Sequence, residues 1–179
     1  PLINSGQYHF GENKVQEADE KWSELKFTNK NIKLHMVGRL QTNKVKKAVK
    51  IFDFIHSVDS KKLADALKKR EEEINRKLSY FIQINLGNES QKGGIDRKEA
   101  ESFVYYCKNE LKINVIGLMG IPPFNEKPEK YFNEISLLNS NFNFKHLSLG
   151  MSNDYSLAIK YKSTFVRIGS GILGQRKSN

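Results

Sequence analysis

The end of the sequence combines glycine and serine at a spacing that could bind a phosphate group. Gly169, Gly171 and Gly174 form the pattern GxGxxG at the end of the apolar run "TFVRIG", residues 164–169. In a dinucleotide-binding turn, a helix and a second strand with an acidic residue about 20 positions on must follow these glycines. Only residues 175–179 follow, so we do not expect a dinucleotide-binding unit here.

A second segment carries similar chemistry. Ser152 follows the apolar run "FKHLSLG", residues 144–150. In (β/α)8 barrels, the loops after strands seven and eight often bind phosphate through backbone N–H groups, hydroxyls and a helix N-terminus. Ser152 and Ser170 supply hydroxyls, and Gly169 and Gly171 let the backbone approach a ligand closely. The two segments are consistent with a phosphate cradle, although a glycine turn with an ordinary serine cap explains the spacing equally well.

Seven short apolar runs are the strands that we expect to position these residues, and amphipathic stretches separate them. The runs are "YHFG" (8–11), "KLHMVG" (33–38), "IFDFIHSV" (51–58), "YFIQINL" (80–86), "INVIGLMGI" (113–121), "FKHLSLG" (144–150) and "TFVRIG" (164–169). Helices are predicted where a capping residue precedes an apolar stripe. The expected caps are Asn13, Asp59 or Ser60, and Asp96.

This alternation predicts a parallel α/β fold, either an open doubly wound sheet or a (β/α)8 TIM barrel. The number and evenness of the units favour the barrel. A complete barrel has eight strands, so we expect the first strand to be missing from this chain, which begins at Pro1 and has its first methionine at Met36. By length, we expect residues 1–179 to form a single domain, incomplete at the N-terminus.

Composition narrows the class of protein. Mean hydropathy is −0.60 and 38% of the residues are hydrophobic, with no apolar run long enough to span a membrane. The single cysteine, Cys107, shares a helical stripe with Phe103 and Val104, which indicates a core residue in a reduced compartment. We expect a cytoplasmic protein without a membrane partner.

The formal net charge of +10 raises the question of a nucleic-acid partner. The densest basic run, "GRLQTNKVKKAVK", contains no acidic residue and carries Arg39, Lys44, Lys46, Lys47 and Lys50. Aromatic side chains that could stack on bases are absent from this run. We therefore favour a solvated helix face and do not expect nucleic acid as a partner.

Seven segments together resemble the YggS/PROSC family of pyridoxal phosphate homeostasis proteins. They are "HFGENKVQEADEKW", "LHMVGRLQTNK", "IHSVDS", "QINLGNESQKGGI", "GLMGIPP", "HLSLGMSND" and "FVRIGSGILGQR". The resemblance implies a barrel similar to the N-terminal domain of alanine racemase, with pyridoxal 5′-phosphate (PLP) at the carboxyl ends of the strands. It also implies a protein that buffers or delivers PLP inside the cell without catalytic turnover.

The same resemblance implies a set of cofactor-binding residues. Ser152, Gly169 and Ser170 would bind the phosphate, Arg167 would face the pyridine nitrogen, and Asn13 would lie near the ring and its 3-oxygen. Additional candidates for the pocket lining are His35, Met119 and Met151. The family's cofactor lysine lies on the first strand, upstream of the FGEN motif, and we expect this chain to lack it. Neither a catalytic residue nor a metal ligand is expected.

An arginine opposite the pyridine nitrogen bears on enzymatic activity. A guanidinium group only donates hydrogen bonds and stays protonated, so it would keep that nitrogen unprotonated. An unprotonated pyridine is a poor electron sink, which favours a carrier of PLP over a transaminase-type enzyme. The alternative is an alanine-racemase-like PLP enzyme on the same barrel. For the carrier, we expect a monomer whose partners are PLP and PLP-dependent apoenzymes.

Overall fold

The computed structural model describes residues 2–87 and 93–174, which form one parallel sheet surrounded by helices. The strands follow one another in sequence order across the sheet, and every neighbouring pair is parallel. They are β1 (His9–Glu12), β2 (Lys33–Met36), β3 (Phe54–Val58), β4 (Ser79–Ile84), β5 (Val115–Gly120), β6 (His146–Met151) and β7 (Phe165–Arg167). All seven predicted strands are confirmed.

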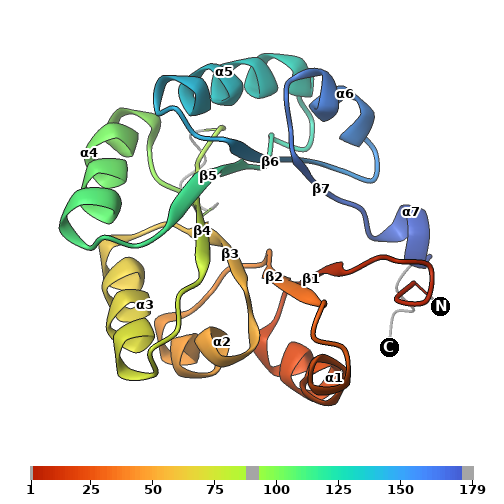
Figure 1. Ribbon diagram of the computed structural model, residues 1–179. Helices are drawn as coiled ribbons and strands as arrows, with labels where there is room; N and C mark the ends of the chain where they lie inside the picture. Colours follow the sequence, from red (N-terminus) through yellow and green to blue (C-terminus); the bar gives the residue numbers. More distant parts are fainter. Residues whose placement is uncertain (1, 88–92, 175–179) are drawn as a thin grey trace.

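The sheet curls into a nearly closed barrel with the helices on its outer face (Figure 1). β1 and β7 are the edge strands. The sequential strand order excludes the doubly wound alternative, which would place helices on both faces of an open sheet. The carboxyl ends of all strands meet at one end of such a barrel, where ligands usually bind.

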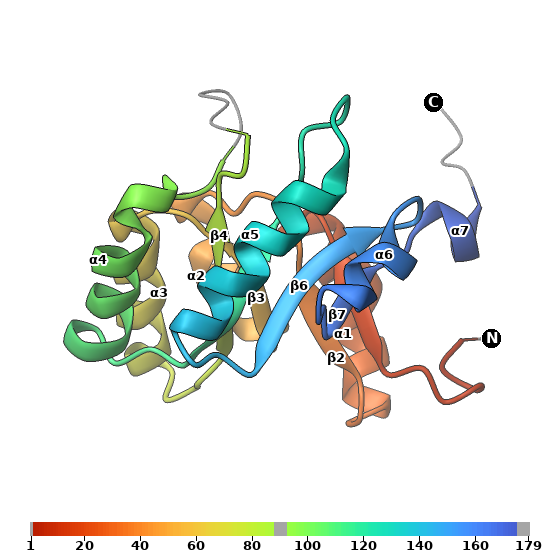
Figure 2. The same ribbon diagram turned by 90° about the horizontal axis from the view of Figure 1, so that it is seen from above.

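The helices form an outer ring, except for the short α7, which lies apart from it after β7 (Figures 1 and 2). The α-helices are α1 (Val15–Thr28), α2 (Val45–Ile51), α3 (Lys61–Glu73), α4 (Ala100–Tyr105), α5 (Pro128–Asn141), α6 (Tyr155–Lys160) and α7 (Ser170–Leu173). Shorter turns are η1 (Thr42–Lys44) and η2 (Arg97–Glu99), both 3₁₀, and η3 (Tyr106–Glu110), a π-helical turn.

The predicted caps are partly confirmed. The Ser60 hydroxyl accepts from the backbone N–H of Leu63, and the Asp96 carboxylate accepts from that of Lys98. The prediction for Asn13 is wrong, because α1 begins after Lys14 without a side-chain cap. Asn13 is instead held by its backbone against Gly38, where an added Cβ would lie 2.3 Å from the Asn13 carbonyl oxygen.

The core fills the space between the strands and their covering helices. Its largest fully buried side chains include Tyr80, Phe52 and Phe132. Cys107 is buried among them, and burial raises the pKa of its thiol to about 12, which makes it an unreactive core residue. The basic side chains of the run "GRLQTNKVKKAVK" are exposed on η1, α2 and the loop before them, the solvated face that the sequence favoured.

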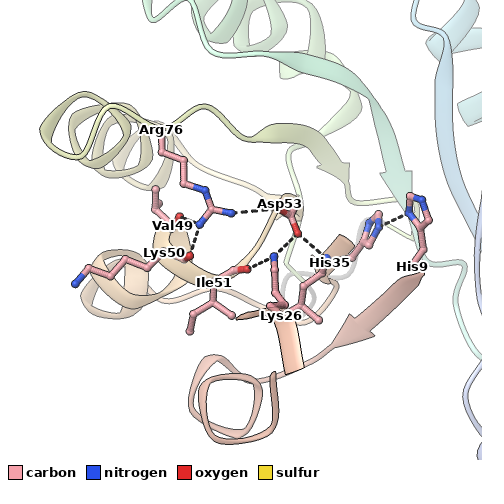
Figure 3. Close-up of polar contacts among 9 residues, drawn as sticks. His9, Lys26, His35, Val49, Lys50, Ile51, Asp53 and Arg76 are labelled. Carbon is pink, nitrogen blue, oxygen red and sulfur yellow. Dashed lines mark hydrogen bonds and ion pairs between the residues drawn. The ribbon is translucent and has the colours of Figure 1, made fainter. Parts of the chain in front are cut away.

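An ionic cluster fastens the amino-end region of the barrel around Asp53, the residue before β3 (Figure 3). Its carboxylate accepts from Lys26 Nζ at 2.5 Å, from the backbone N–H of Leu34 at 2.7 Å and from Arg76 at 3.1 Å. Lys26 and Arg76 also bind carbonyl oxygens at the end of α2. Asp53 therefore joins α1, β2 and the turn before β4 at the end of the barrel opposite the expected site.

Within residues 2–87 and 93–174, no helix is both long and apolar enough to cross a membrane.

Close contact between β5 and β6 makes Gly117 sensitive to substitution. A Cβ at Gly117 would lie 2.0 Å from the carbonyl oxygen of His146. We expect Gly117→Ala to lower the free energy of unfolding by roughly 3 kcal/mol, because strand backbones cannot easily separate. The matched control is Gly11→Ala in β1, where the Cβ would meet only Val37 methyl groups at 3.4 Å or more. We expect it to change stability by about 0.5 kcal/mol or less. Equal losses in urea unfolding would contradict this account.

Candidate functional site

The structure brings the two predicted phosphate-binding segments together. Ser152 follows β6, and its Oγ accepts hydrogen bonds from the backbone N–H groups of Gly169 and Gly171, each at 3.3 Å. Ser170 begins α7 between these two glycines. We call this arrangement of Ser152 and residues 169–171 the cradle. It gathers two backbone donors and two hydroxyl groups at the carboxyl end of the barrel.

Gly150 shapes the chain leading into the cradle. Its φ is +86°, a conformation that favours glycine, and an added Cβ would lie 2.6 Å from Ala158 of α6. The turn that follows is fixed by Asp154, whose carboxylate accepts from the backbone N–H of Met151 at 2.6 Å. The segment "SLGMS" thus combines an inward serine, Ser148, with a backbone turn that carries Ser152 toward β7.

Arg167, the last residue of β7, points into the barrel beneath the cradle. Its guanidinium donates to Ser148 Oγ at 2.8 Å, to the Ser148 carbonyl at 2.9 Å and to the Gly120 carbonyl at 3.0 Å. These contacts use three of the five N–H donors of an arginine. Burial lowers the pKa of Arg167 to about 10, and the nearby Asp154 charge opposes this shift. The guanidinium therefore remains charged at neutral pH.

Asn13 lies at the carboxyl end of β1 but not in the cradle. It lines a cavity of about 350 Å³ whose wall also includes Gly38, Arg39, Gln83 and Asn85. Among the described contacts, none joins the Asn13 side chain to Ser152, Arg167 or α7. The structure thus brings four of the five predicted residues to β6 and β7 and leaves Asn13 across the mouth of the barrel.

The additional candidates have different surroundings. Met119 is fully buried in β5, and Met151 is half-exposed at the end of β6. His35 is 4% exposed inside the barrel, where its Nε2 lies 2.9 Å from His9 Nδ1 (Figure 3) and its Nδ1 lies 2.9 Å from His56 Nε2. His35 is therefore an interior residue rather than part of the mouth.

Sequence reasoning missed the continuation of this contact. His56 Nδ1 lies 2.9 Å from Ser148 Oγ, so hydrogen bonds run without a break from His9 through His35, His56 and Ser148 to Arg167. We call these five side chains the interior chain. A signal for it was present, because a polar residue interrupts the apolar run of each of these five strands.

The buried imidazoles of the interior chain are neutral. Burial, and next the His9 charge, lowers the pKa of His35 to about 3. Burial, then His35 and Arg167, lowers the pKa of His56 well below its ordinary value. His35 stacks on Phe54 and His56 stacks on Phe81, so apolar rings replace water around both. A neutral imidazole can both donate and accept, which continuity of the chain requires.

The cradle carries the kinds of polar group that bind anions in proteins. The cradle offers N–H and O–H groups, the contacts that phosphate oxygens accept. A Cβ at Gly169 would meet no atom within 4 Å, so the backbone there is open to a ligand. In the part of the chain that the structure describes, no group of three or more His, Cys, Asp or Glu side chains could hold a metal ion.

The comparisons with known proteins agree with this geometry. The family model described as "Alanine racemase, N-terminal domain" matches residues 2–177. A pyridoxal phosphate homeostasis protein of Aquifex aeolicus is 39% identical, over 98% of this chain and 80% of its own length. A protein of the same name from Haemophilus influenzae is 34% identical, over 96% of this chain and 77% of its own length.

Solved structures show the same fold. PipY of Synechococcus elongatus, determined with PLP bound, superposes with a TM-score of 0.88 at 31% identity, over 96% of this chain and 84% of that chain. An alanine racemase from Clostridium difficile superposes with a TM-score of 0.76 at 13% identity, over 99% of this chain and 47% of that chain. This second likeness supports the barrel alone.

The lowered pKa values of His35 and His56 predict a loss of stability in acid. The unfolded chain takes up protons near pH 6.5, whereas folded His35 takes one up only near pH 3. The free energy of unfolding is therefore highest, as far as these rings are concerned, above about pH 6.5. It falls as pH falls toward about 3, by on the order of 1 kcal/mol per pH unit for each ring. Urea unfolding at about pH 7, 6 and 5 measures this slope.

The control for this measurement is the double variant His35→Gln/His56→Gln. It removes both titrating rings but keeps side-chain amides that can donate and accept hydrogen bonds. It retains Asp59 and Glu71, whose pKa values are raised by burial and which act in the opposite direction. We expect the variant to lose most of the acid-side slope. A slope equal to that of the unmodified chain would contradict the assignment of neutral buried imidazoles.

Proposed function

The chain belongs to the family of pyridoxal phosphate homeostasis proteins, and on this premise we propose that it binds PLP with the phosphate in the cradle. The observation that carries the proposal is the Ser152 Oγ atom, an oxygen that accepts from two backbone N–H groups at the start of α7. A phosphate oxygen needs the same surroundings. When bound, PLP supplies an aldehyde on a pyridine ring.

In this proposal, Ser152 and Ser170 donate their hydroxyl hydrogens to the phosphate, and the backbone of Gly169 approaches it closely. The Ser152 hydroxyl is suited to this role, because its oxygen accepts from Gly169 and Gly171 while its hydrogen is available to a ligand. Charge-assisted hydrogen bonds of this kind are roughly twice as strong as neutral ones.

Arg167 would bind the ring nitrogen and would hold it unprotonated. Its donors to Ser148 and Gly120 fix the plane of the guanidinium, and two further N–H groups remain for a ligand. Asn13, at the end of β1, would face the ring from across the barrel mouth. The proposed cofactor-binding set is therefore Asn13, Ser152, Arg167, Gly169 and Ser170.

We propose a binding role without catalytic turnover. With an arginine at the ring nitrogen, that nitrogen cannot hold the proton that makes the ring an electron sink. The relatives' printed names, which describe homeostasis, agree with a role in buffering PLP or delivering it to PLP-dependent apoenzymes. The proposed binding unit is one chain, because the cradle and Arg167 with its supports come from one chain.

Removal of the cradle hydroxyls tests the phosphate assignment. We expect the double variant Ser152→Ala/Ser170→Ala to bind PLP at least about 100-fold more weakly, because each lost hydrogen bond to a charged group is worth about 1.5 kcal/mol or more. Titration with PLP, followed by quenching of Trp22 fluorescence and by equilibrium dialysis, gives the dissociation constants.

The matched control is Ser140→Ala at an exposed position of α5, where the hydroxyl donates to the Ser136 carbonyl of the same helix. It should bind PLP as the unmodified chain does. Unchanged affinity in the double variant would show that the phosphate does not bind in the cradle. Tighter binding by Ser152→Ala alone would show that Ser152 competes with the phosphate for the glycine N–H groups, and would contradict its assigned role.

The absence of turnover has its own test. We expect the protein incubated with PLP and L-alanine to produce no D-alanine above a no-protein control, while the same sample retains PLP on dialysis. Chiral chromatography of the amino acid measures the product. Formation of D-alanine at a rate proportional to protein concentration would support the racemase alternative instead.

A further inference from the structure

The cavity that Arg39 lines has the features of a second binding site. Its volume is about 350 Å³, within the usual range of small-molecule pockets. Its wall comes from the end of β4 and from the segments that follow β1, β2, β4 and β5. Among the described residues, its wall includes neither Arg167 nor any residue of the cradle. We call it the Arg39 cavity. It lies at the carboxyl ends of the strands, where barrels bind their ligands.

Backbone contacts fix the wall of the Arg39 cavity. An added Cβ at Gly38 would lie 2.3 Å from the Asn13 carbonyl oxygen, so the chain after β2 lies directly against the chain after β1. Arg39 is the next residue, and this contact determines where its side chain begins. The segment after β4 is held in the same way, because the N–H of Ile95 donates to the Gln83 carbonyl at 2.8 Å. The folded backbone therefore forms the cavity before any ligand binds.

Arg39 supplies the positive charge of the cavity. Its side chain is exposed, and no ion pair joins it to a carboxylate within residues 2–87 and 93–174. The acidic side chain that interacts with it electrostatically is Asp59, whose pKa is raised by burial while the Arg39 charge opposes this shift. Asp59 is not part of the cavity wall. A guanidinium only donates hydrogen bonds, so the cavity favours a ligand with a negatively charged acceptor.

Neutral amides surround this charge. The side chains of Asn13, Gln83 and Asn85 line the cavity together with Arg39. Gln83 uses one of its two amide hydrogens to bind the Gly93 carbonyl at 2.9 Å. Amide groups can donate to a carboxylate and can also accept from an ammonium group. The polar part of the wall therefore suits a ligand with one negative charge, with or without an amino group beside it.

The rest of the wall is apolar. Val37, Ile84, Leu86 and Ile121 contribute it. Ile121 is 39% exposed, so a ligand in the cavity would remove apolar surface from water, which is favourable. A bare phosphate has no apolar part that could use this surface. The cavity thus differs in chemistry from the cradle, whose groups are hydroxyls and backbone N–H groups.

We propose that the Arg39 cavity binds a small aliphatic carboxylate. The guanidinium donates to both carboxylate oxygens, since its planar fork matches their geometry. The aliphatic tail lies against Val37, Leu86 and Ile121. A plain carboxylic acid and an α-amino acid with an apolar side chain share this chemistry. Asn13 belongs both to this wall and to the proposed PLP-binding set, so the two sites adjoin, but the inference itself does not depend on PLP.

Isothermal titration calorimetry of the unmodified chain, without PLP, tests the inference with matched probes. 4-Methylpentanoate has a carboxylate and a branched tail, its amide has the tail without the charge, and acetate has the charge without the tail. We expect saturable binding of 4-methylpentanoate, at least about tenfold tighter than that of either other probe. Equal affinity for the amide would overturn the inference.

Leucine distinguishes the two sources of the carboxylate, because it is 4-methylpentanoate with an α-amino group. Tighter binding of leucine would identify an amino acid as the ligand, and weaker binding would identify a plain carboxylic acid. Failure of both compounds to bind would overturn the inference.

Arg39→Gln is the decisive variant, because it removes the charge and leaves an amide that can still donate. We expect it to bind 4-methylpentanoate at least about tenfold more weakly than the unmodified chain. The matched control is Lys46→Gln on α2, which removes the same charge at an exposed position outside the cavity wall. Its affinity should equal that of the unmodified chain. Equal affinities of Arg39→Gln and the unmodified chain would contradict the assignment to this cavity.

Two further measurements separate this site from the cradle. The double variant Ser152→Ala/Ser170→Ala should bind 4-methylpentanoate as the unmodified chain does, so a failure of the PLP proposal leaves this inference intact. Loss of that binding in the double variant would place the carboxylate in the cradle and overturn the inference. Inorganic phosphate at equal concentration should not displace 4-methylpentanoate. Displacement would show a general anion site and would overturn the assignment to carboxylates.

Discussion

The cost of burying a polar group without a hydrogen bond explains the line of polar side chains inside this barrel. His35, His56 and Ser148 are nearly inaccessible to solvent, and each would destabilise the fold if it lacked a partner. They satisfy one another in a line that begins on β1 and ends at Arg167 on β7. These interior hydrogen bonds link the two edge strands, β1 and β7, which are otherwise connected only through the strands between them.

The position of the cradle depends on that line. Arg167 is held by Ser148 and Gly120, so the end of β7 has a fixed place relative to β5 and β6. Two residues later the chain reaches Gly169, whose N–H meets Ser152. Ser148 and Ser152 lie on either side of Gly150, whose positive φ turns the chain between them. The same short segment thus supports both the guanidinium and the cradle.

Much of this arrangement could be predicted from sequence, because it follows from periodicity and from the chemistry of short segments. The seven apolar runs form seven strands in sequence order. Ser152 lies beside the glycines that follow "FVRI", as expected for the loops after two neighbouring barrel strands. For the interior chain the sequence carried only the signal of a polar residue in each of five apolar runs. It could not show that these residues join, because that depends on which side chains of the five strands face inward at one level. The prediction that Asn13 caps α1 was wrong because a tertiary contact, which the local sequence does not show, holds the Asn13 backbone against Gly38.

The most direct test of the account is a crystal structure of the protein soaked or grown with PLP. We predict phosphate density between Ser152 and the first residues of α7, with the pyridine nitrogen within hydrogen-bonding distance of Arg167. A phosphate found in the cavity beside Arg39 and Gln83, or a ring nitrogen that faces away from Arg167, would contradict the account.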